Sequence, residues 1–557
     1  MILQKSSLGE VVRRMKSGFA VVAGLSLFVN LLMLVPALYM LQLYDRVLVS
    51  RSVETLLVLT GILVFMFIFL TLMDWIRHRV VTRLANRFEQ ELRHHLFHAM
   101  YDWILAEPDR ASSLPVRDLF QIRQFIASPG FTALFDAPWI PVYIFVLFLF
   151  HDLYGWFAVM TLIVMSFLLL LTEKFSREPG QKAQGLQNQS QQQTDFNVRN
   201  FEVVEGMGMR TALYQQWDAI QTGWQMEQTK ANDQHANGSV LAKYLRLLFQ
   251  SLILGLGGYL VINMELTPGM MIAGSIVLGR ALAPLDLLTG QWKNMVSARA
   301  AYHRLNQLLS SFPQKQASMP LPEPEGRIQI ENLIYIPAGM EKPILSGVNL
   351  QLNQGQLLGI IGPSASGKTS LVRVLLGVSK GYRGKVEMDG AELSLWNREE
   401  LGQYVGYLPQ DIELFKGSVK DNIARFQQLE PDAVIAAAQL ADAHEMILGL
   451  PQGYDTVIGE SNTVLSAGQR QRIALARAVL GNPKLVILDE PNANLDDAGE
   501  RALANTLIRL KSSGTVVIMI SHRVPVLRVM DQIAVMNEGR IDKVMLAAEF
   551  FQAMQKR

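Results

Sequence analysis

The sequence contains no cysteine, which excludes a disulfide framework, a thiolate metal site and a cysteine nucleophile. It is also poor in charge, because only 18% of its 557 residues are Asp, Glu, Lys or Arg, against about 25% in an average soluble domain. Half of the residues are hydrophobic, and the mean hydropathy is +0.19. This composition excludes a disordered chain and disfavours a chain that is soluble throughout. The formal net charge of +2 gives no support for a strongly basic nucleic-acid binder.

The hydrophobic residues gather in six runs, all before residue 290. A helix needs about 20 mainly apolar residues to cross the hydrocarbon core of a bilayer. We expect spans at 19–43, 55–73, 137–150, 153–172, 247–264 and 266–288. The third run is short, and the sixth contains Arg280 and Asp286. The second and fourth have no polar face to present to water, which disfavours buried helices of a soluble protein.

The flanks of these runs indicate the orientation. The first run is too long for a cleaved signal peptide and lacks a small-residue cleavage site, so we expect it to stay as the first span. Lys and Arg are concentrated before the first span and after the second and fourth spans. Because positive residues favour the cytoplasmic side, both termini are predicted to be cytoplasmic.

Two long polar segments, 74–135 and 173–246, separate the spans and read as helices that run into the cytosol and back. The second contains a glutamine-rich run from Gln184 to Gln193. This run is either a solvated helical face or a polar wall of a cytoplasmic vestibule. We expect an α-helical membrane domain over 1–310 that includes these extensions.

Residues 311–326 contain four prolines in a short polar stretch, which indicates an extended linker. Beyond it, short β-rich runs such as 357–361, 485–488 and 515–520 alternate with helical ones. Such alternation is typical of a parallel sheet flanked by helices. We therefore expect an α/β domain over 327–557.

The strongest local motif follows the run at 357–361 and fits G-x-x-x-x-G-K-[ST], a phosphate-binding loop between a strand and a helix. Its backbone N–H groups close around phosphate, and the following helix presents its positive end. Lys368 is expected to reach the β/γ-phosphates, and the Thr369 hydroxyl to ligate Mg²⁺. The predicted ATP-binding residues of this loop are Gly362, Pro363, Ser364, Ala365, Ser366, Gly367, Lys368, Thr369 and Ser370.

An apolar run at 485–488 ends in two acids, Asp489 and Glu490. A buried strand would bring Asp489 out at its end, where it can hold Mg²⁺ through the water shell of the metal. Glu490 can then polarise the attacking water. Alone, this arrangement is weak evidence for a site that hydrolyses a nucleotide. It becomes strong evidence because it lies about 120 residues after a phosphate-binding loop.

The segment formed by Leu465, Ser466, Ala467, Gly468 and Gln469 resembles the signature motif of ATP-binding-cassette proteins. It departs from the usual form in having Ala467 where glycine is common. The resemblance implies that Ser466 and Gly468 contact the γ-phosphate of ATP bound to a second subunit. A serine and a glycine that open a helix also form an anion site on physical grounds.

Other cassette elements follow the order that the resemblance implies. Gln410 matches the Q-loop glutamine that senses Mg²⁺ and the attacking water. Asp496 matches the aspartate of the D-loop, and His522 matches the switch histidine. The family usually stacks adenine on an aromatic residue, but Pro337 falls at that place. Tyr335 lies two residues earlier and is either the stacking residue or a core strand residue.

Six spans ahead of one cassette resemble an exporter half-transporter, of which two copies are needed. The segments 43–48, 50–56 and 135–141 are similar to the first external loop and the third-span entry of type I secretion ATPases. The closest subgroup exports proteases, lipases and repeat-containing proteins that carry an uncleaved carboxy-terminal signal. We expect no amino-terminal peptidase-like domain, since the first span starts near residue 19. The resemblance implies a periplasmic adaptor and an outer-membrane channel as partners.

Several polar residues of the membrane half have two interpretations. Tyr44, Asp45 and Arg46 form a local turn with a salt bridge or touch an adaptor. Asp136 caps the third helix or contacts cargo. Arg280 and Asp286 line a pathway or lie where the sixth span leaves the bilayer. His94 and His98 are four residues apart and could bind a metal, but a solvated helix is the favoured interpretation.

The sequence thus predicts a homodimeric, ATP- and Mg²⁺-dependent exporter of unfolded polypeptide in a bacterial inner membrane. One alternative is an exporter of lipid or small hydrophobic molecules that acts without an adaptor and an outer-membrane channel. The segments at 43–56 and 135–141 argue against it. A second alternative, a non-transporting regulatory ATPase, is disfavoured by the six spans and the complete set of catalytic residues.

Overall fold

The structure is a computed structural model that describes residues 7–107, 113–313, 321–337, 340–459, 465–493, 495 and 497–555. The chain forms two compact units. The first contains Met1–Tyr101 and Ser112–Gln314, and the second contains Asp102–Ala111 and Lys315–Arg557. Asp496, the predicted D-loop residue, lies outside the described residues.

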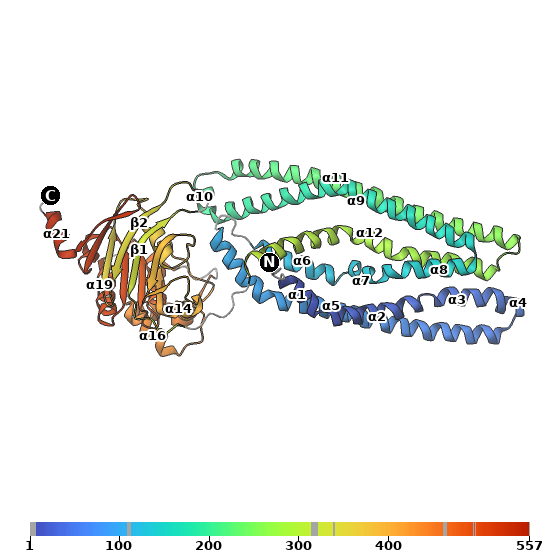
Figure 1. The fold of residues 1–557 in the computed structure, drawn as a ribbon, viewed down its shortest axis with the longest axis horizontal. Helices are drawn as coiled ribbons and strands as arrows, with labels where there is room; N and C mark the ends of the chain where they lie inside the picture. The colour runs from blue at the N-terminus through green and yellow to red at the C-terminus, as the bar shows by residue number, and fades with distance from the viewer. Residues whose placement is uncertain are drawn as a thin grey trace. The chain divides into compact units, whose positions relative to one another are not determined.

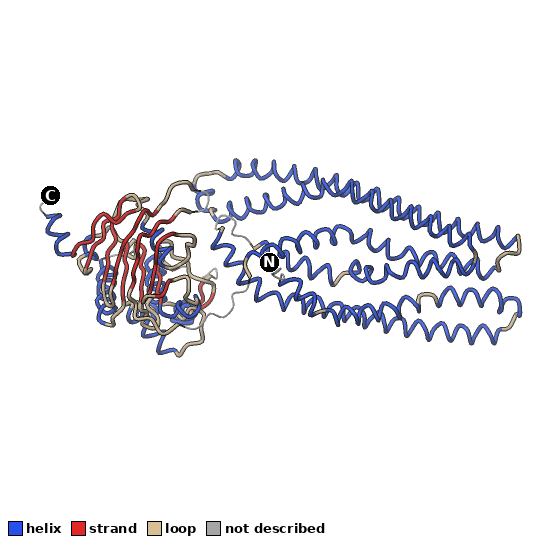
Figure 2. The backbone as a smooth tube through the Cα atoms, in the orientation of Figure 1, coloured by secondary structure: helices blue, strands red, loops and turns tan. Residues whose placement is uncertain are grey.

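In its described part the first unit consists of helices joined by short loops and contains no strand (Figures 1 and 2). Among the described residues, six stretches are long and apolar enough to cross a membrane, which confirms the predicted number of spans. They are Lys16–Ser50, Val53–Ala106, Pro129–Phe150, Asp152–Arg199, Arg210–Ile262 and Pro268–Ser311. The helices are α1 (Ser7–Arg14), α2 (Lys16–Leu32), α3 (Val35–Gln42), η1 (Leu43–Val47), α4 (Leu48–Ser50), α5 (Val53–Ala106), α6 (Leu114–Ile126), α7 (Pro129–Asp136), η3 (Ala137–Trp139), α8 (Ile140–Phe150), α9 (Asp152–Arg199), α10 (Phe201–Gly206), α11 (Arg210–Ile262) and α12 (Pro268–Ser311).

Four of these helices pass without a break from the apolar run into the polar extension. Helix α5 has 54 residues, α9 has 48, α11 has 53 and α12 has 44. A continuous helix satisfies its own backbone hydrogen bonds, as a membrane span must. Helices α9 and α11 run side by side (Figure 1) and approach closely, because a Cβ on Gly238 would lie 2.1 Å from the Thr172 hydroxyl.

The third span is longer than its apolar run suggested, because it is built from three pieces, α7, η3 and α8. Proline lies in the first turn of each piece, where its missing N–H breaks no helical hydrogen bond. The span ends at His151, whose extended backbone separates α8 from α9 and whose ring accepts a hydrogen bond from the Leu153 N–H.

A buried polar network joins the first three spans. The Arg77 guanidinium, on α5, lies 2.8 Å from the Asp136 carboxylate and 2.7 Å from the Asp74 carboxylate. Asn30, on α2, donates to Asp136 at 2.8 Å and accepts from the Tyr143 hydroxyl at 3.0 Å. Asp136 makes no capping hydrogen bond, so the interpretation as a helix cap was wrong. Its carboxylate is instead needed by the nearly buried arginine, whose exposed fraction is 6%.

A second polar contact joins the ends of the first and sixth spans. Asp45, in η1, accepts hydrogen bonds from the Thr267 hydroxyl at 2.6 Å and from the Gly269 N–H at 2.9 Å. Both donors lie at the start of α12, so Asp45 supplies negative charge to the positive end of that helix. Gly269 leaves room for it, because a Cβ there would lie 2.6 Å from the carboxylate. In the described part of the chain no Asp45–Arg46 ion pair occurs, in contrast to the predicted local salt bridge.

The second unit contains a six-stranded sheet in the order β12-β11-β3-β10-β9-β6. Strands β11, β3, β10, β9 and β6 are parallel, and β12 is antiparallel to β11. A four-stranded antiparallel sheet, β2-β1-β4-β5, and a two-stranded one, β7-β8, complete the unit. The strands are β1 (Ile328–Tyr335), β2 (Leu345–Leu352), β3 (Leu357–Ile361), β4 (Arg383–Met388), β5 (Ala391–Glu392), β6 (Val405–Leu408), β7 (Gly417–Ser418), β8 (Val457–Ile458), β9 (Leu485–Asp489), β10 (Val516–Ile520), β11 (Gln532–Asn537) and β12 (Arg540–Leu546).

Helices cover this parallel sheet, which confirms the expected fold class of a helical membrane domain fused to an α/β nucleotide-binding domain (Figure 2). They are α13 (Lys368–Leu375), α14 (Arg398–Tyr404), α15 (Val419–Ile423), α16 (Pro431–Leu440), α17 (His444–Leu448), η4 (Gly453–Asp455), α18 (Ala467–Ala478), α19 (Asp497–Ser512), α20 (Val524–Leu527) and α21 (Ala547–Gln555). Strands β9 and β10 are buried along their whole length. Because parallel strands end at one edge, the residues after β3, β9 and β10 converge there.

The Arg77 network gives a first prediction. In Asp136→Ala the buried arginine keeps only Asp74 as an acidic partner. We expect a loss of about 2 kcal/mol, below the roughly 3–5 kcal/mol that follows when a buried charge loses its sole partner. Thermal unfolding in detergent measures it. As a control, Glu205→Ala breaks the exposed pair with Arg210, which is worth at most about 1 kcal/mol. Equal losses in the two variants would contradict a stabilising role of the network.

Candidate nucleotide-hydrolysis site

The phosphate-binding loop lies between β3 and α13. Gly367 has a φ of +98° and Ala365 a φ of +62°, so the chain turns through left-handed conformations before α13 begins. Gly362 follows β3 directly, and a Cβ there would lie 2.1 Å from the Met536 carbonyl oxygen, so this position requires glycine. The Ser366 hydroxyl is buried without a hydrogen-bond partner. The loop therefore offers an unpaired donor beside the positive end of α13.

Lys368 is nearly buried and folds over the loop. Its ammonium donates to the carbonyl oxygens of Gly362 and Pro363, each at 2.8 Å. Burial lowers the pKa of Lys368, and the nearby carboxylates of Glu490 and Asp489 oppose that shift. An ammonium has three donors, so one remains for an incoming anion.

Asp489 is the last residue of β9 and only 2% exposed. One of its carboxylate oxygens has no hydrogen-bond partner, and the Thr369 hydroxyl bonds to the carboxyl group. Burial raises the pKa of Asp489, and the Thr369 hydrogen bond and Lys368 partly offset the rise. A buried, under-partnered carboxylate beside a hydroxyl is the oxygen donor set that Mg²⁺ prefers, so these residues fit that ion.

Glu490 lies next to Asp489 with a φ of +50°, which turns the chain sharply after the strand. Its carboxylate accepts a hydrogen bond from the Gln410 side-chain amide at 3.4 Å and lies 3.9 Å from the His522 Nε2 atom. The structure thus brings together three side chains that are far apart in sequence. They are an acid that can take a proton from water and two groups that can orient that water.

Three residues that the sequence analysis missed hold this arrangement. The Gln471 side-chain amide, on α18, donates to the Pro491 carbonyl next to Glu490. Ser521, which precedes His522, donates to the Asn492 side chain at 3.1 Å. These bonds tie the segments after β9 and β10 together. Polar residues soon after buried strands were the available signal for Asn492 and Ser521, whereas Gln471, within α18, carried none.

The predicted signature segment forms the start of α18. Ser466 is the N-cap, accepts from the Gln469 N–H at 3.2 Å, and its own N–H donates to the Gln469 side chain. Leu465 is buried, whereas Ser466 and Ala467 are exposed and Gly468 is half-buried. Since Ala467 is exposed, the methyl group that replaces the usual glycine meets no packing constraint from the described residues.

Tyr335 ends β1, and its half-buried ring packs against the core of the second unit. In the membrane half, Asp286 pairs with Arg246 of α11. The His94 and His98 rings lie 4.6 Å apart. Over the described ranges no cluster of three or more His, Asp or Glu residues is placed to hold a metal.

Comparisons with known proteins agree with this geometry. Residues 19–280 match the ABC transporter transmembrane region, and residues 345–493 match the ABC transporter family. The structure of a bacterial Atm1-family ABC exporter with ATP bound has a TM-score of 0.82, covering 97% of this chain and 96% of that chain. At 19% identity this likeness shows the fold alone. The fold and the site together define a multi-pass membrane ATPase of the ABC class.

Relatives with higher sequence identity show which group of ABC transporters the chain belongs to. The type I secretion system ATP-binding protein PrsD of Rhizobium meliloti is 41% identical, covering 95% of this chain and 91% of its own length. The leukotoxin translocation ATP-binding protein LktB of Mannheimia haemolytica and the toxin RTX-I translocation ATP-binding protein of Actinobacillus pleuropneumoniae are each 29% identical over 93% of this chain and 74% of their own length. The chain therefore belongs to the type I secretion ATP-binding proteins of the ABC transporter family.

Asp489 gives a second prediction. A carboxyl group whose pKa is raised by folding binds its proton more tightly in the folded state than in the unfolded state. The free energy of unfolding therefore decreases as the pH rises from the pKa of the unfolded state through the pKa of the folded state. Without nucleotide or metal, Asp489→Asn should therefore unfold at a higher temperature at pH 7, by about 2–4 °C per kcal/mol gained. The gain should shrink as the pH falls to about 4, the ordinary pKa of an Asp side chain.

Thermal unfolding of the full chain across this pH range tests the prediction. Asp542→Asn, at an exposed position of β12, is the matched control and should change little. A stabilisation of Asp489→Asn that does not depend on pH would contradict the assignment of the effect to buried charge.

Proposed function

We propose that the chain is the energising subunit of a type I secretion system, which exports an unfolded protein with a carboxy-terminal secretion signal. The similarity to PrsD along nearly the whole chain carries this proposal. The names of the toxin-translocating relatives support protein cargo over the alternative of lipid or small hydrophobic molecules. The complete catalytic set argues against a non-transporting regulatory ATPase.

The active unit in this proposal is a homodimer in the bacterial inner membrane, with both termini and the ATP-binding domains in the cytoplasm. Ser466 and Gly468 lie at an exposed helix start, as a segment that completes the ATP site of a second copy requires. A periplasmic adaptor and an outer-membrane channel would continue the path.

The described side chains suggest the course of hydrolysis. Lys368, Ser366 and the N–H groups of the loop bind the β- and γ-phosphates of ATP. Thr369 and Asp489, with Gln410, would hold Mg²⁺, which neutralises charge on the phosphates when bound. Glu490 accepts a proton from the attacking water. His522 and Gln410, both close to Glu490, orient that water against the γ-phosphate. Tyr335 remains the candidate for stacking on adenine.

The third prediction concerns Glu490→Gln, which keeps the shape of the side chain but removes its basicity. We expect ATP hydrolysis to fall by about 10²–10⁴-fold while ATP is still bound, because general base catalysis contributes that much. Phosphate release and nucleotide binding by the purified protein in lipid measure the two effects. Glu445→Gln, at an exposed position of α17, is the control and should retain activity. Unchanged hydrolysis in Glu490→Gln would exclude Glu490 as the base.

The fourth prediction concerns cargo. A carboxy-terminal peptide of a candidate secreted protein should change the ATPase rate of the protein in lipid vesicles in a saturable way, whereas a scrambled peptide should not. The change should be absent in Glu490→Gln. Stimulation by lipids or amphiphilic small molecules, with no response to several such peptides, would favour the alternative exporter.

A further inference from the structure

The six predicted apolar runs contain two charged residues, Arg280 and Asp286, both in the last run. Asp286 forms an ion pair with Arg246, which directly precedes the fifth run. Arg280 has no ion pair and no side-chain hydrogen bond to any residue that the structure describes. An ionised side chain at membrane depth is costly, so it usually pairs with another charge or lines a pathway. Arg280 is therefore a candidate functional residue that the hydrolysis site does not use.

Arg280 lies deep in the sixth span. It follows the start of α12 at Pro268 by 12 residues, or about 18 Å, and precedes the end of the apolar run by eight residues, or about 12 Å. Both distances exceed the length of an arginine side chain, so the guanidinium cannot reach a headgroup region. Val277 and Pro284, about one turn away on either side, are buried, and α12 is the most buried of the six spans. Arg280 thus belongs to the interior of the membrane unit.

The nearby polar network does not neutralise Arg280. The buried Tyr143 hydroxyl interacts electrostatically with both Arg280 and Asp136, so Asp136 is an acid of this region. One Asp136 oxygen accepts hydrogen bonds from Arg77 and from Asn30, each at 2.8 Å, and no ion pair joins Asp136 to Arg280. The network therefore serves Arg77 and leaves Arg280 without a carboxylate in contact.

The spans of a second copy would not supply the missing charge either. The apolar runs hold no acid besides Asp286, which Arg246 engages, and a two-fold dimer brings a second unpaired Arg280 into the membrane. Glu173, one residue past the fourth run, is the main competing partner. The charge of the apolar runs therefore favours a carboxylate that comes from outside both copies.

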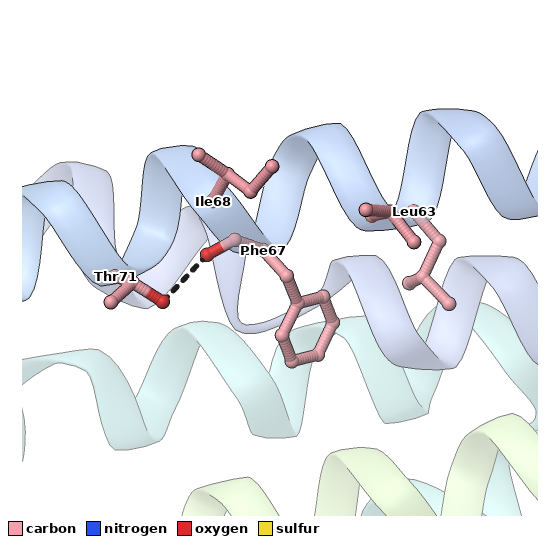
Figure 3. Close-up of a pocket in the computed structure, with 5 residues that line it drawn as sticks. Leu63, Phe67, Ile68 and Thr71 are labelled. Carbon is pink, nitrogen blue, oxygen red and sulfur yellow. Dashed lines mark hydrogen bonds between the residues drawn. The ribbon is translucent and has the colours of Figure 1, made fainter.

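The shallow hollow on α5 is not an alternative site for a charged group (Figure 3). Its lining consists of Leu63, Val64, Phe67, Ile68 and Thr71. The Thr71 hydroxyl donates to the Phe67 carbonyl at 2.8 Å, so its proton is already used (Figure 3). The hollow therefore offers apolar contacts and no charge, whereas Arg280 offers both N–H donors and a charge.

We propose that Arg280 binds the acidic side chains of the exported polypeptide while they cross the membrane. This inference rests on polypeptide export, the proposed function, and names the cargo chemistry that the membrane path accepts. A guanidinium holds a carboxylate through two parallel N–H···O bonds. Each charge compensates the other where water is scarce, so acidic cargo crosses this depth at a lower cost than neutral or basic cargo.

Two unstructured peptides that differ only in Asp against Asn provide the first test. The ATPase rate of the full-length protein in phosphatidylcholine nanodiscs is titrated with each peptide. We expect the Asp peptide to half-saturate the response at a roughly tenfold lower concentration, because its carboxylates form charge-assisted hydrogen bonds. Arg280→Gln should remove this difference, and Arg280→Lys, which keeps the charge, should retain most of it. Arg299→Gln is the matched control, because Arg299 is exposed on the same helix about 28 Å nearer the cytosol.

The lack of cysteine permits a second test, which asks whether position 280 is open to water in the assembled protein. Arg280→Cys introduces the single thiol of the chain. A methanethiosulfonate that carries a trimethylammonium group should react with this thiol and restore the preference for the Asp peptide, because it returns a positive charge. Methyl methanethiosulfonate should react without restoring the preference. The unaltered protein, which has no thiol, is the control for both reagents.

Equal responses to the two peptides in the unaltered protein would overturn this proposal and leave polypeptide export intact. No response to either peptide would overturn both. An equal loss of the preference in Arg299→Gln would overturn the assignment to Arg280. A thiol that does not react would show that the position is closed in the assembled dimer, and this result would overturn the proposal as well.

Two further variations separate competing anions. A several-fold stronger preference in Glu173→Gln would show that Glu173 of a second copy occupies Arg280, and this would overturn the proposal. Loss of the preference when phosphatidylglycerol replaces part of the phosphatidylcholine would assign Arg280 to lipid phosphate instead of cargo. An unchanged preference in both variations is the result that the proposal requires.

Discussion

The cost of burying ionised side chains constrains both halves of this protein. In the membrane unit, Arg77 is nearly inaccessible and is matched by Asp136 and Asp74. In the ATP-binding unit, Asp489 is equally buried, but one of its oxygens has no partner. The first charge is compensated within the chain, so the loss of one of its partners would destabilise the fold. The second is under-compensated and therefore favours an incoming cation. The same physical rule thus separates a structural site from a functional one.

Most of the architecture follows from patterns that the sequence shows openly. Runs of apolar residues predict six spans because hydrocarbon thickness sets their length, and short β-rich runs predict the parallel sheet. The loop with Lys368 and the acids Asp489 and Glu490 are recognisable because their chemistry fixes both residue type and spacing. The place of the third span's start was harder to predict, since Pro129 and Pro138 lie in helical first turns instead of ending the helix.

Side-chain partners over long sequence separations could not be predicted. Asp136 looked like a helix cap because two prolines follow it, yet its partner is an arginine 59 residues earlier. Gln471, Asn492 and Ser521 carry no motif of their own, and only the convergence of β9 and β10 gives them a role. Periodicity reports which face of an element is apolar. It does not report which distant polar group will lie opposite.

The contact of Asp45 with the start of α12 has a consequence for biosynthesis. Its donors, Thr267 and Gly269, are made more than 220 residues later. While the intervening spans are synthesised and inserted, the aspartate has no access to this helix end. The membrane domain can therefore close its first span on its last only after the sixth span has left the ribosome. Completion of the bundle is thereby tied to completion of translation of the membrane half.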